Sequence, residues 1–332
     1  MFALRPAPVR RRLAPLNAAE QRRHKWRNRL HSLILLGGMI GLLALCGFVV
    51  FGPDGLIGLA LAGGVLLLLS PQVSPQLVLR RYRAREIGHP ELLWLLDALS
   101  QRAELPRRPR IFSIDSQIMP VMNAFAVGSR NNAAIVVTDI MLARLSIREL
   151  AGVIAHEVSH VRNDDLWLMG LADLVGRLTR AMSLAGIVLI VLFLPTWLMG
   201  TVELPWLLLP LLLFAPQVTV LLQLALSRTR EFDADLDAAG LTGDPEGLAS
   251  ALDKLERFQR GVWEQILMPG YRLPEPSVLR THPPTAERVA RLLALVEEEP
   301  PERLPFDRPE RVLQPPPAVV LGPRHRLFRP WY

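Results

Sequence analysis

The stretch "LAGVIAHEVSHVRNDD", residues 150–165, decides the fold because its periodicity predicts a long helix with two distinct faces. Ser146, with Glu149 three residues later, forms a capping-box pattern that marks the start of this helix. Apolar side chains then recur at helical spacing, at Leu150, Val153, Ile154 and Val158. We therefore expect a helix with an apolar stripe on one side and its polar residues elsewhere.

The polar residues of this helix include two histidines four positions apart, with a glutamate directly after the first. His156 and His160 differ by roughly 40° in azimuth and about 6 Å in rise, so both imidazoles can reach one Zn²⁺ at about 2.0–2.1 Å. Glu157 is rotated about 100° from His156, and in zinc hydrolases a glutamate placed so contacts the reacting water rather than the metal. The alternative is an ordinary helix with two solvated or hydrogen-bonded histidines.

A catalytic zinc needs a third protein ligand and one open position. The candidates elsewhere in the chain are His282 and the acidic residues of "SRTREFDADLDAAG", residues 227–240. Glu231 and Asp235 are four positions apart on one helix face, so Glu231 can bind a metal while Asp235 orients a ligand histidine. An acidic, solvated helix face explains the same spacing equally well.

The composition places much of the chain in a membrane. Half of the 332 residues are hydrophobic, and the mean hydropathy is +0.25. Four runs nearly free of charge are each close to or above the roughly 20 residues that a helix needs to span a bilayer. They cover residues 33–52, 56–79, 181–202 and 204–227. We expect two transmembrane helical hairpins. Pro195, Pro210 and Pro216 interrupt the second one, and the alternative for it is a hydrophobic hairpin that lies in the membrane interface or packs on the domain.

Charge and cysteine usage narrow the function classes. The formal charge is +7, and arginines flank both apolar pairs, so the soluble parts are expected in the cytoplasm. Because the arginines lie beside the apolar runs, they are better explained as positive flanks of membrane segments than as a nucleic-acid-binding surface. A single cysteine, Cys46, excludes a disulfide framework or a CxxC zinc site within the chain. All but two of the 38 basic residues are arginine, which indicates a GC-rich, bacterial genome.

The apolar runs divide the chain into six segments. These are a basic cytoplasmic N-terminus (1–31), the first hairpin (32–80), a first soluble part (84–180), the second hairpin (181–227), a second soluble part (228–298) and a tail rich in proline and arginine (299–332). The first soluble part contains three strand candidates, at 110–115, 123–128 and 133–138. The last two are expected to form a hairpin through the turn at 129–132.

Several separated motifs together resemble the HtpX-type membrane zinc endopeptidases, a family related to the CAAX prenyl endopeptidases. The motifs are "NAFAVG" (123–128), "HEVSHVRNDD" (156–165), "SRTREFDAD" (227–235) followed by "LTGDPEGLASALDKL" (241–255), and "THPPTAERVARL" (281–292). The resemblance implies an α+β fold. This fold is a mainly helical, zincin-like metalloprotease domain with a small antiparallel sheet, combined with the two transmembrane helical hairpins.

The resemblance also implies the roles of individual residues. In a gluzincin of this kind, one Zn²⁺ per chain is bound by His156, His160 and Glu231. Glu157 is the general base, and Asp235 supports a ligand histidine. Glu231 and Asp235 stand at the positions that the family uses for these two roles.

Two further groups are implied to act on the substrate. An edge strand that binds the extended substrate corresponds to Asn123, Ala124, Phe125 and Ala126. His282 and Arg288 match residues that face the reaction centre and help to stabilise the tetrahedral oxyanion. Without the resemblance, 123–128 is equally an ordinary hairpin strand, and His282, before two prolines, is typical of the start of a helix.

The expected function is a zinc-dependent endopeptidase of the bacterial inner membrane with a cytoplasmic active site. Its expected partners are protein substrates, especially membrane or misfolded proteins, and the lipid bilayer, with no nucleic acid. The alternative is a non-cleaving membrane scaffold or chaperone that retains a structural zinc site. Glu157 favours the enzyme, because a structural site has no use for a general base.

Overall fold

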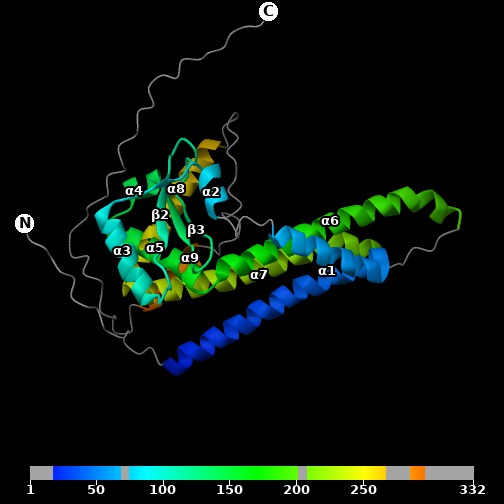
Figure 1. The fold of residues 1–332 in the computed structure, drawn as a ribbon, viewed down its shortest axis with the longest axis horizontal. Helices are drawn as coiled ribbons and strands as arrows, with labels where there is room; N and C mark the ends of the chain where they lie inside the picture. The colour runs from blue at the N-terminus through cyan, green and yellow to red at the C-terminus, as the bar shows by residue number, and fades with distance from the viewer. Residues whose placement is uncertain (1–17, 69–74, 201–207, 267–284, 296–332) are drawn as a thin grey trace, which may run out of the picture.

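The computed structural model describes residues 18–68, 75–200, 208–266 and 285–295. Figure 1 shows two parts, a small domain of helices and strands and a set of long helices that project from one side of it. The first 17 residues, the predicted tail at 299–332 and the predicted catalytic residue His282 lie outside the described residues.

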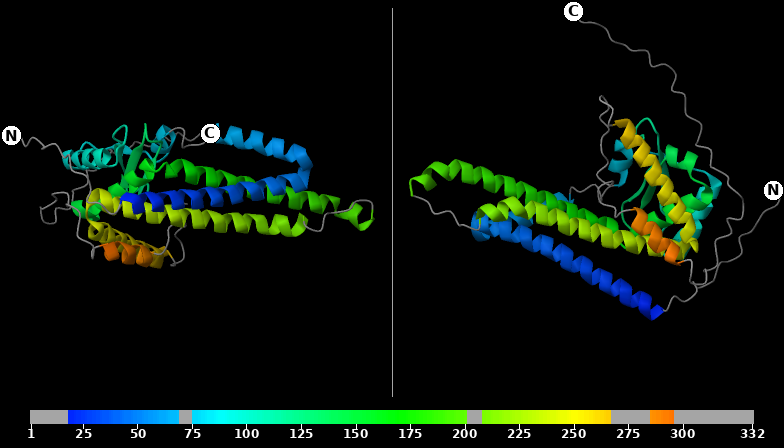
Figure 2. Two further views of the ribbon diagram at one scale, coloured as in Figure 1. Left: turned by 90° about the horizontal axis from the view of Figure 1, so that it is seen from below. Right: turned by 180° about the vertical axis from the view of Figure 1, so that it is seen from behind.

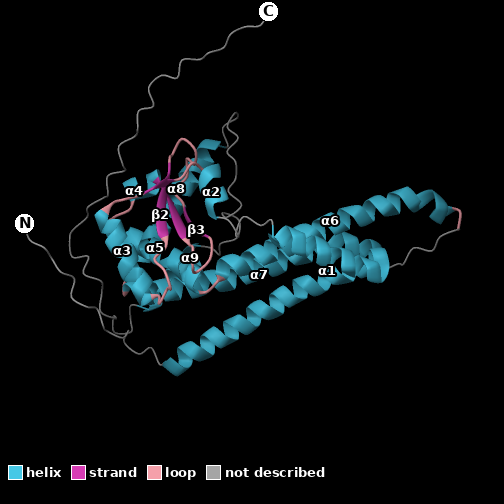
Figure 3. Cartoon of the chain, viewed as in Figure 1, coloured by secondary structure: helices cyan, strands magenta, loops and turns pink. Residues whose placement is uncertain are grey.

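Four short strands form one sheet in the order β1-β2-β4-β3. Figure 3 shows strands β2 and β3 of this sheet among the helices of the domain. The strands are β1 (Arg85–Glu86), β2 (Arg110–Ile114), β3 (Ala124–Val127) and β4 (Ala134–Thr138). β2 and β4 are parallel, whereas β1 with β2 and β3 with β4 are antiparallel. The expected mainly helical α+β class is confirmed, but the expected purely antiparallel sheet is wrong, because the sheet is mixed.

Burial explains this strand order. All residues of β4 are buried, so this strand takes an inner position between two neighbours. β3 alternates between buried and half-buried residues and takes the edge. The two strands form the predicted hairpin, in which Asn132 Oδ1 accepts hydrogen bonds from the backbone N–H of Ser129 (2.9 Å) and from its hydroxyl (2.8 Å).

The helix predicted from the opening stretch is α5 (Ile147–Arg162), and it runs through the centre of the domain. Its capping box forms as expected, since Glu149 Oε2 accepts from Ser146 N at 2.9 Å and Ser146 Oγ accepts from Glu149 N at 3.4 Å. α5 packs against β3, β4, α7 and α8. A Cβ added to Gly152 would lie 2.9 Å from Leu248 Cα, so the backbones of α5 and α8 approach closely.

The remaining helices of the domain surround α5 and the sheet. They are α2 (Pro75–Arg81), α3 (Pro90–Arg102), α4 (Asp139–Arg144), α8 (Pro245–Ile266) and α9 (Thr285–Ala294). Most of the buried apolar side chains of α3, α5 and β4 belong to one continuous core. This core holds α5 rigidly beside the sheet.

Three helices within the described residues are long and apolar enough to cross a membrane: α1 (Ala18–Leu68), α6 (Asp165–Leu198) and α7 (Leu208–Thr242). They pack on one another and project from the domain (Figure 2). Large apolar side chains such as Leu61 and Leu192 remain two-thirds exposed on them. A surface of this kind suits lipid rather than water.

The chain reverses direction inside α1. Gly52 has φ 66° and ψ −154°, a conformation that glycine adopts readily and residues with a Cβ rarely do. Pro53 follows it directly. Figure 2 shows the two arms of α1 on either side of this turn. By contrast, α6 and α7 run without a break through the predicted boundaries at 180 and 227, so the same helices belong to both the bundle and the domain.

Glu149 ties the first turn of α5 to α8. Its carboxylate accepts hydrogen bonds from Ser250 Oγ at 2.6 Å and from Lys254 Nζ at 2.8 Å. Burial opposes ionisation, but the hydrogen bonds from Lys254, Ser250 and Ser146 outweigh it and lower the pKa of Glu149 below its ordinary value of 4.5. Glu149 therefore stabilises the fold in its ionised form.

We predict that Glu149→Gln lowers the free energy of unfolding by about 1–3 kcal/mol at neutral pH. Because the folded-state pKa is depressed, the stabilisation is present above about pH 4.5 and is lost as pH falls through that depressed value. Thermal unfolding of the detergent-solubilised protein at pH 7 and below about pH 4 should show the deficit narrowing in acid. Glu104→Gln, at an exposed carboxylate, is the control; equal deficits at both pH values would contradict the assignment.

Candidate metal centre

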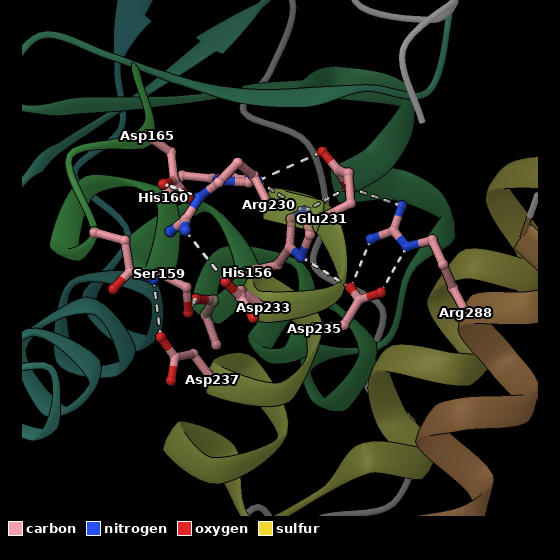
Figure 4. Close-up of polar contacts among 12 residues, drawn as sticks. His156, Ser159, His160, Asp165, Arg230, Glu231, Asp233, Asp235, Asp237 and Arg288 are labelled. Carbon is pink, nitrogen blue, oxygen red and sulfur yellow. Dashed lines mark hydrogen bonds and ion pairs between the residues drawn. The ribbon is translucent and has the colours of Figure 1, made fainter. Parts of the chain in front are cut away.

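Three donor side chains converge where α5 passes α7 (Figure 4). His156 and His160 come from α5, and Glu231 comes from α7. The two Nε2 atoms are 3.2 Å apart. The carboxylate oxygens of Glu231 lie 3.4 Å from Nε2 of His156 and 3.6 Å from Nε2 of His160.

These spacings fit a single metal ion. Ligand atoms held at 2.0–2.1 Å around a tetrahedral Zn²⁺ lie roughly 3.3–3.4 Å from one another. The observed separations of 3.2, 3.4 and 3.6 Å bracket that value. Within the described part of the chain, this is the one cluster of three or more His, Cys, Asp or Glu side chains whose ligand atoms could share an ion.

Each imidazole is held by a carboxylate at its other nitrogen. His156 Nδ1 lies 3.0 Å from Asp235 Oδ1, and His160 Nδ1 lies 2.9 Å from Asp165 Oδ2. A carboxylate at Nδ1 favours the tautomer in which Nδ1 carries the proton and Nε2 carries a lone pair. The two lone pairs then face each other across 3.2 Å, and they repel unless a positive charge lies between them.

An arginine stands behind each of these carboxylates. Arg288 donates from Nε and Nη2 to Asp235 at 2.7 and 2.6 Å, and Arg230 donates from Nε to Asp165 at 2.6 Å. The result is two histidine–aspartate–arginine chains, His156–Asp235–Arg288 and His160–Asp165–Arg230. Both arginines and both aspartates are buried, so these contacts fix the ring orientations before any metal arrives.

The charge of the cluster also favours a cation. Five carboxylates and two guanidinium groups meet here, and with neutral imidazoles the cluster carries three excess negative charges. The carboxylates are those of Glu157, Asp165, Glu231, Asp233 and Asp235, and the guanidinium groups are those of Arg230 and Arg288. A divalent cation reduces this excess in a site where water is largely excluded.

The pKa of His156 reflects the same field. Burial opposes protonation of this ring, but the hydrogen bonds to Asp235 and Glu231 outweigh burial and raise its pKa to about 10. In the metal-free protein a proton therefore occupies the ring at neutral pH. A metal that binds to His156 has to displace this proton.

A free sheet edge lies beside the donors. β3 is the terminal strand of the sheet and packs against α5, and its outer edge has no strand partner among the described residues. Its start is anchored where Asn123 N donates to Thr138 Oγ1 at 3.1 Å. Glu157, next to His156, is also buried on α5. The arrangement thus combines three metal-donor side chains, a buried carboxylate and a free strand edge.

The structure brings five of the predicted site residues together: His156, His160, Glu231, Asp235 and Arg288. The guanidinium of Arg288 is engaged by Asp235, and its Nη1 lies 3.2 Å from Glu231 Oε2. Its observed contacts therefore position other groups, and its predicted role at the oxyanion stays a prediction.

Sequence reasoning missed Asp165 and Arg230. Asp164 adopts the left-handed conformation (φ 57°) after the end of α5, and the chain turns so that Asp165 reaches back to His160. The available signals were an acidic residue five positions after the second histidine and an arginine directly before Glu231. Neither signal indicates which residue the side chain of Asp165 or Arg230 contacts in the folded protein.

Several known proteins are similar to this chain. A sequence model described as "Peptidase family M48" matches residues 89–296. A protein named "Protease HtpX homolog" from Desulforapulum autotrophicum is 32% identical over 296 residues, covering 80% of this chain and 89% of that one. Another of that name from Paraburkholderia phytofirmans is 35% identical over 280 residues, covering 79% and 91%. A crystal structure of S. mikatae Ste24p has a TM-score of 0.47 at 21% identity, covering 81% of this chain and 66% of that one.

We predict that Asp165→Asn and Asp235→Asn each lower metal affinity by about 10–100-fold, because an amide holds the imidazole less firmly and makes it a weaker ligand. Titration of metal-free protein with Zn²⁺ against a chromophoric chelator measures this without reference to activity. Asp97→Asn, at an exposed aspartate paired with Arg108, is the matched control. Unchanged Zn²⁺ affinity in both variants would show that the two histidine–aspartate–arginine series do not act on the metal.

Proposed function

Because the chain belongs to peptidase family M48, we propose that it is a zinc-dependent endopeptidase that cleaves membrane or misfolded proteins at the cytoplasmic face of the bacterial inner membrane. That it is a membrane-associated metalloendopeptidase follows from the family match, the HtpX-named relatives and the three apolar helices. The observation that carries the metal chemistry is the set of three donors 3.2–3.6 Å apart, with both histidine Nδ1 atoms held by carboxylates.

The donor set supports zinc as the metal. Two imidazoles and one carboxylate from His156, His160 and Glu231 are ligands that Zn²⁺ takes in hydrolytic sites, and three protein ligands leave one position open. When bound, the ion supplies a Lewis acid that polarises a carbonyl and acidifies water. The two histidine–aspartate–arginine chains keep the rings aimed at its position.

Glu157 carries the proton transfers in this proposal. It follows His156 on α5, where rotation by about 100° separates its side chain from the ligand face. It accepts the proton of the attacking water and then delivers it to the leaving amine, so that one group serves both halves of the reaction. His282 and Arg288 are proposed to stabilise the oxyanion of the tetrahedral intermediate.

The free edge of β3 is proposed to bind the substrate as an added strand. Asn123, Ala124, Phe125 and Ala126 contribute this edge. Backbone hydrogen bonds hold an extended peptide without regard to most of its side chains. Such binding suits a protease that acts on unfolded segments of many proteins.

The proposed location follows from charge and helix length. Arg177, Arg180 and Arg228 lie on the parts of α6 and α7 that lead from the domain into the apolar bundle, and cytoplasmic flanks are rich in arginine. A catalytic domain that shares two helices with the bundle stays next to the bilayer. The proposed substrates are therefore cytoplasmic segments of membrane proteins, which lie close to the catalytic domain.

We predict that Glu157→Gln retains the metal but lowers peptide-bond cleavage by about 10²–10⁴-fold, because only the general base is removed. Purified, zinc-loaded wild type and variant are compared on an unfolded protein and on a membrane protein in proteoliposomes, with metal content measured in parallel. Equal cleavage by both would rule out this role for Glu157. No cleavage by either, with zinc present in both, would favour a non-cleaving scaffold or chaperone.

We predict that the turn of α1 and the catalytic domain lie on opposite sides of the membrane. In a Cys46→Ala background, Asp54→Cys at the exposed turn should react with an impermeant maleimide in intact spheroplasts. Glu104→Cys, after α3 in the domain, should react only after permeabilisation, because the proposed site is cytoplasmic. The reverse pattern would place the active site outside the cell.

A further inference from the structure

We propose that a cavity next to the N-terminal end of β3 binds a carboxylate of the substrate. This carboxylate belongs to the part of the substrate that lies on the C-terminal side of the scissile bond. The cavity has a volume of about 420 Å³ and is lined by Met122, Arg144, Lys254, Arg257 and Phe258. This inference rests on the proposed function, since it names a preference of the same peptidase site.

The chemistry of the cavity suits an anion with a short apolar stem. Met122 and Phe258 supply apolar surface, and the Arg144 guanidinium lies 4.8 Å from the centre of the Phe258 ring. Stacking of this kind fixes the guanidinium plane while leaving its N–H groups free to donate. Arg144 ends α4, whereas Phe258 belongs to α8, so the subsite joins two elements (both labelled in Figure 1).

The positive groups face the cavity and the negative ones do not. Lys254 Nζ is 2.8 Å from Glu149, and Arg257 pairs with Asp253, yet neither carboxylate lines the cavity. Among the residues that the structure describes, no carboxylate pairs with Arg144. A carboxylate that enters thus meets the guanidinium of Arg144, which has no carboxylate partner among the described residues, with the ion-paired Lys254 and Arg257 alongside.

The cavity lies at one end of the proposed substrate strand. Met122 comes immediately before the β3 segment and contributes to the cavity together with Arg144, which lies just ahead of α5. At the other end of β3, Arg130 in the β3–β4 turn reaches Asp164, just after α5, at 4.0 Å. β3 and α5 therefore run alongside in the same direction, and the metal-binding histidines lie between these two ends.

This alignment gives the bound peptide a direction. Antiparallel pairing is the more stable and the more common way to add a strand to an edge. A peptide antiparallel to β3 points its C-terminal part toward Met122 and the cavity. Glu149, which binds Lys254, precedes His156 by seven helical residues, or about 10 Å. At roughly 3.3 Å per residue, the favoured carboxylate lies about three residues beyond the scissile bond.

Two sources can supply this carboxylate. One is an aspartate or glutamate within a longer substrate, and the other is the free C-terminus of a substrate that ends there. Both present the same planar acceptor to guanidinium donors. Two peptide series distinguish these sources: one varies an internal side chain, and the other varies only the C-terminal group.

The test uses the zinc-loaded full chain in detergent and quenched-fluorescent peptides of one sequence, with the scissile bond located by mass spectrometry. A single Glu, Gln or Lys is moved through the first five positions after that bond, and through the matching positions before it. We expect a maximum for Glu near the third position, with kcat/KM about fivefold above Gln, the upper range for an exposed ion pair. A second series ends at this position with a free carboxylate or an amide.

The ratio of kcat/KM for the Glu peptide to kcat/KM for the Gln peptide should fall to near one in the double variant Arg144→Gln, Arg257→Gln. This ratio should be unchanged in Arg108→Gln, a control at an exposed arginine of the same domain. Equal cleavage of Glu, Gln and Lys peptides by the wild type overturns the subsite but leaves the proposed function intact. A preference for Glu before the scissile bond overturns the direction. Binding of the same peptides to metal-loaded Glu157→Gln, by fluorescence anisotropy, should show the same order; peptides that are neither cleaved nor bound would overturn both proposals.

Discussion

The centre depends on one electrostatic constraint. When both Nδ1 atoms carry the proton, the Nε2 lone pairs of His156 and His160 face each other across 3.2 Å, and a positive charge between them relieves the repulsion. The carboxylates of Asp165 and Asp235 impose this geometry, because each fixes the proton of its imidazole on the far nitrogen. In the metal-free protein, despite burial of the ring, the hydrogen bonds of His156 to Asp235 and Glu231 raise its pKa to about 10, and the proton held on this ring meets the constraint. A divalent cation meets it more fully, because it also offsets the charge of Glu231 and of the acidic cluster around it.

The same constraint links the site to the membrane part of the chain. Asp165 is the first residue of α6 and Arg230 lies in α7, and their 2.6 Å hydrogen bond joins the two helices beside His160. Both helices continue into the apolar bundle, where Gly186 allows Leu212 to pack closely. A sliding movement of α6 along α7 would separate Asp165 from Arg230 and release the ring of His160. The order of the bundle is therefore a condition for the order of the metal site.

Local signals predicted the parts of this structure that depend on neighbouring residues, and tertiary contacts account for the rest. The capping box at Ser146 and the spacing of the two histidines operate within one helix, so the sequence alone indicates α5 and its polar face. Glu231 was an even choice on spacing, because nothing local distinguishes a ligand from a solvated carboxylate. Arg230 was missed for a similar reason: its partner on α6 is 65 residues away in the chain. The mixed sheet was missed because strand order is decided by which strands are wholly buried, and burial depends on the whole domain.

The strand order that the sequence did not predict has a consequence for function. If the three main strands had paired in chain order as a simple antiparallel meander, β3 would lie between β2 and β4, and both of its edges would be used. Instead β4 pairs with β2 in parallel, and β3 is left at the edge of the sheet, against α5. The parallel pairing thus leaves the free edge to which the proposed substrate strand would add. Because β3 is held from one side only, a peptide can complete its hydrogen bonding without displacing any strand of the protein.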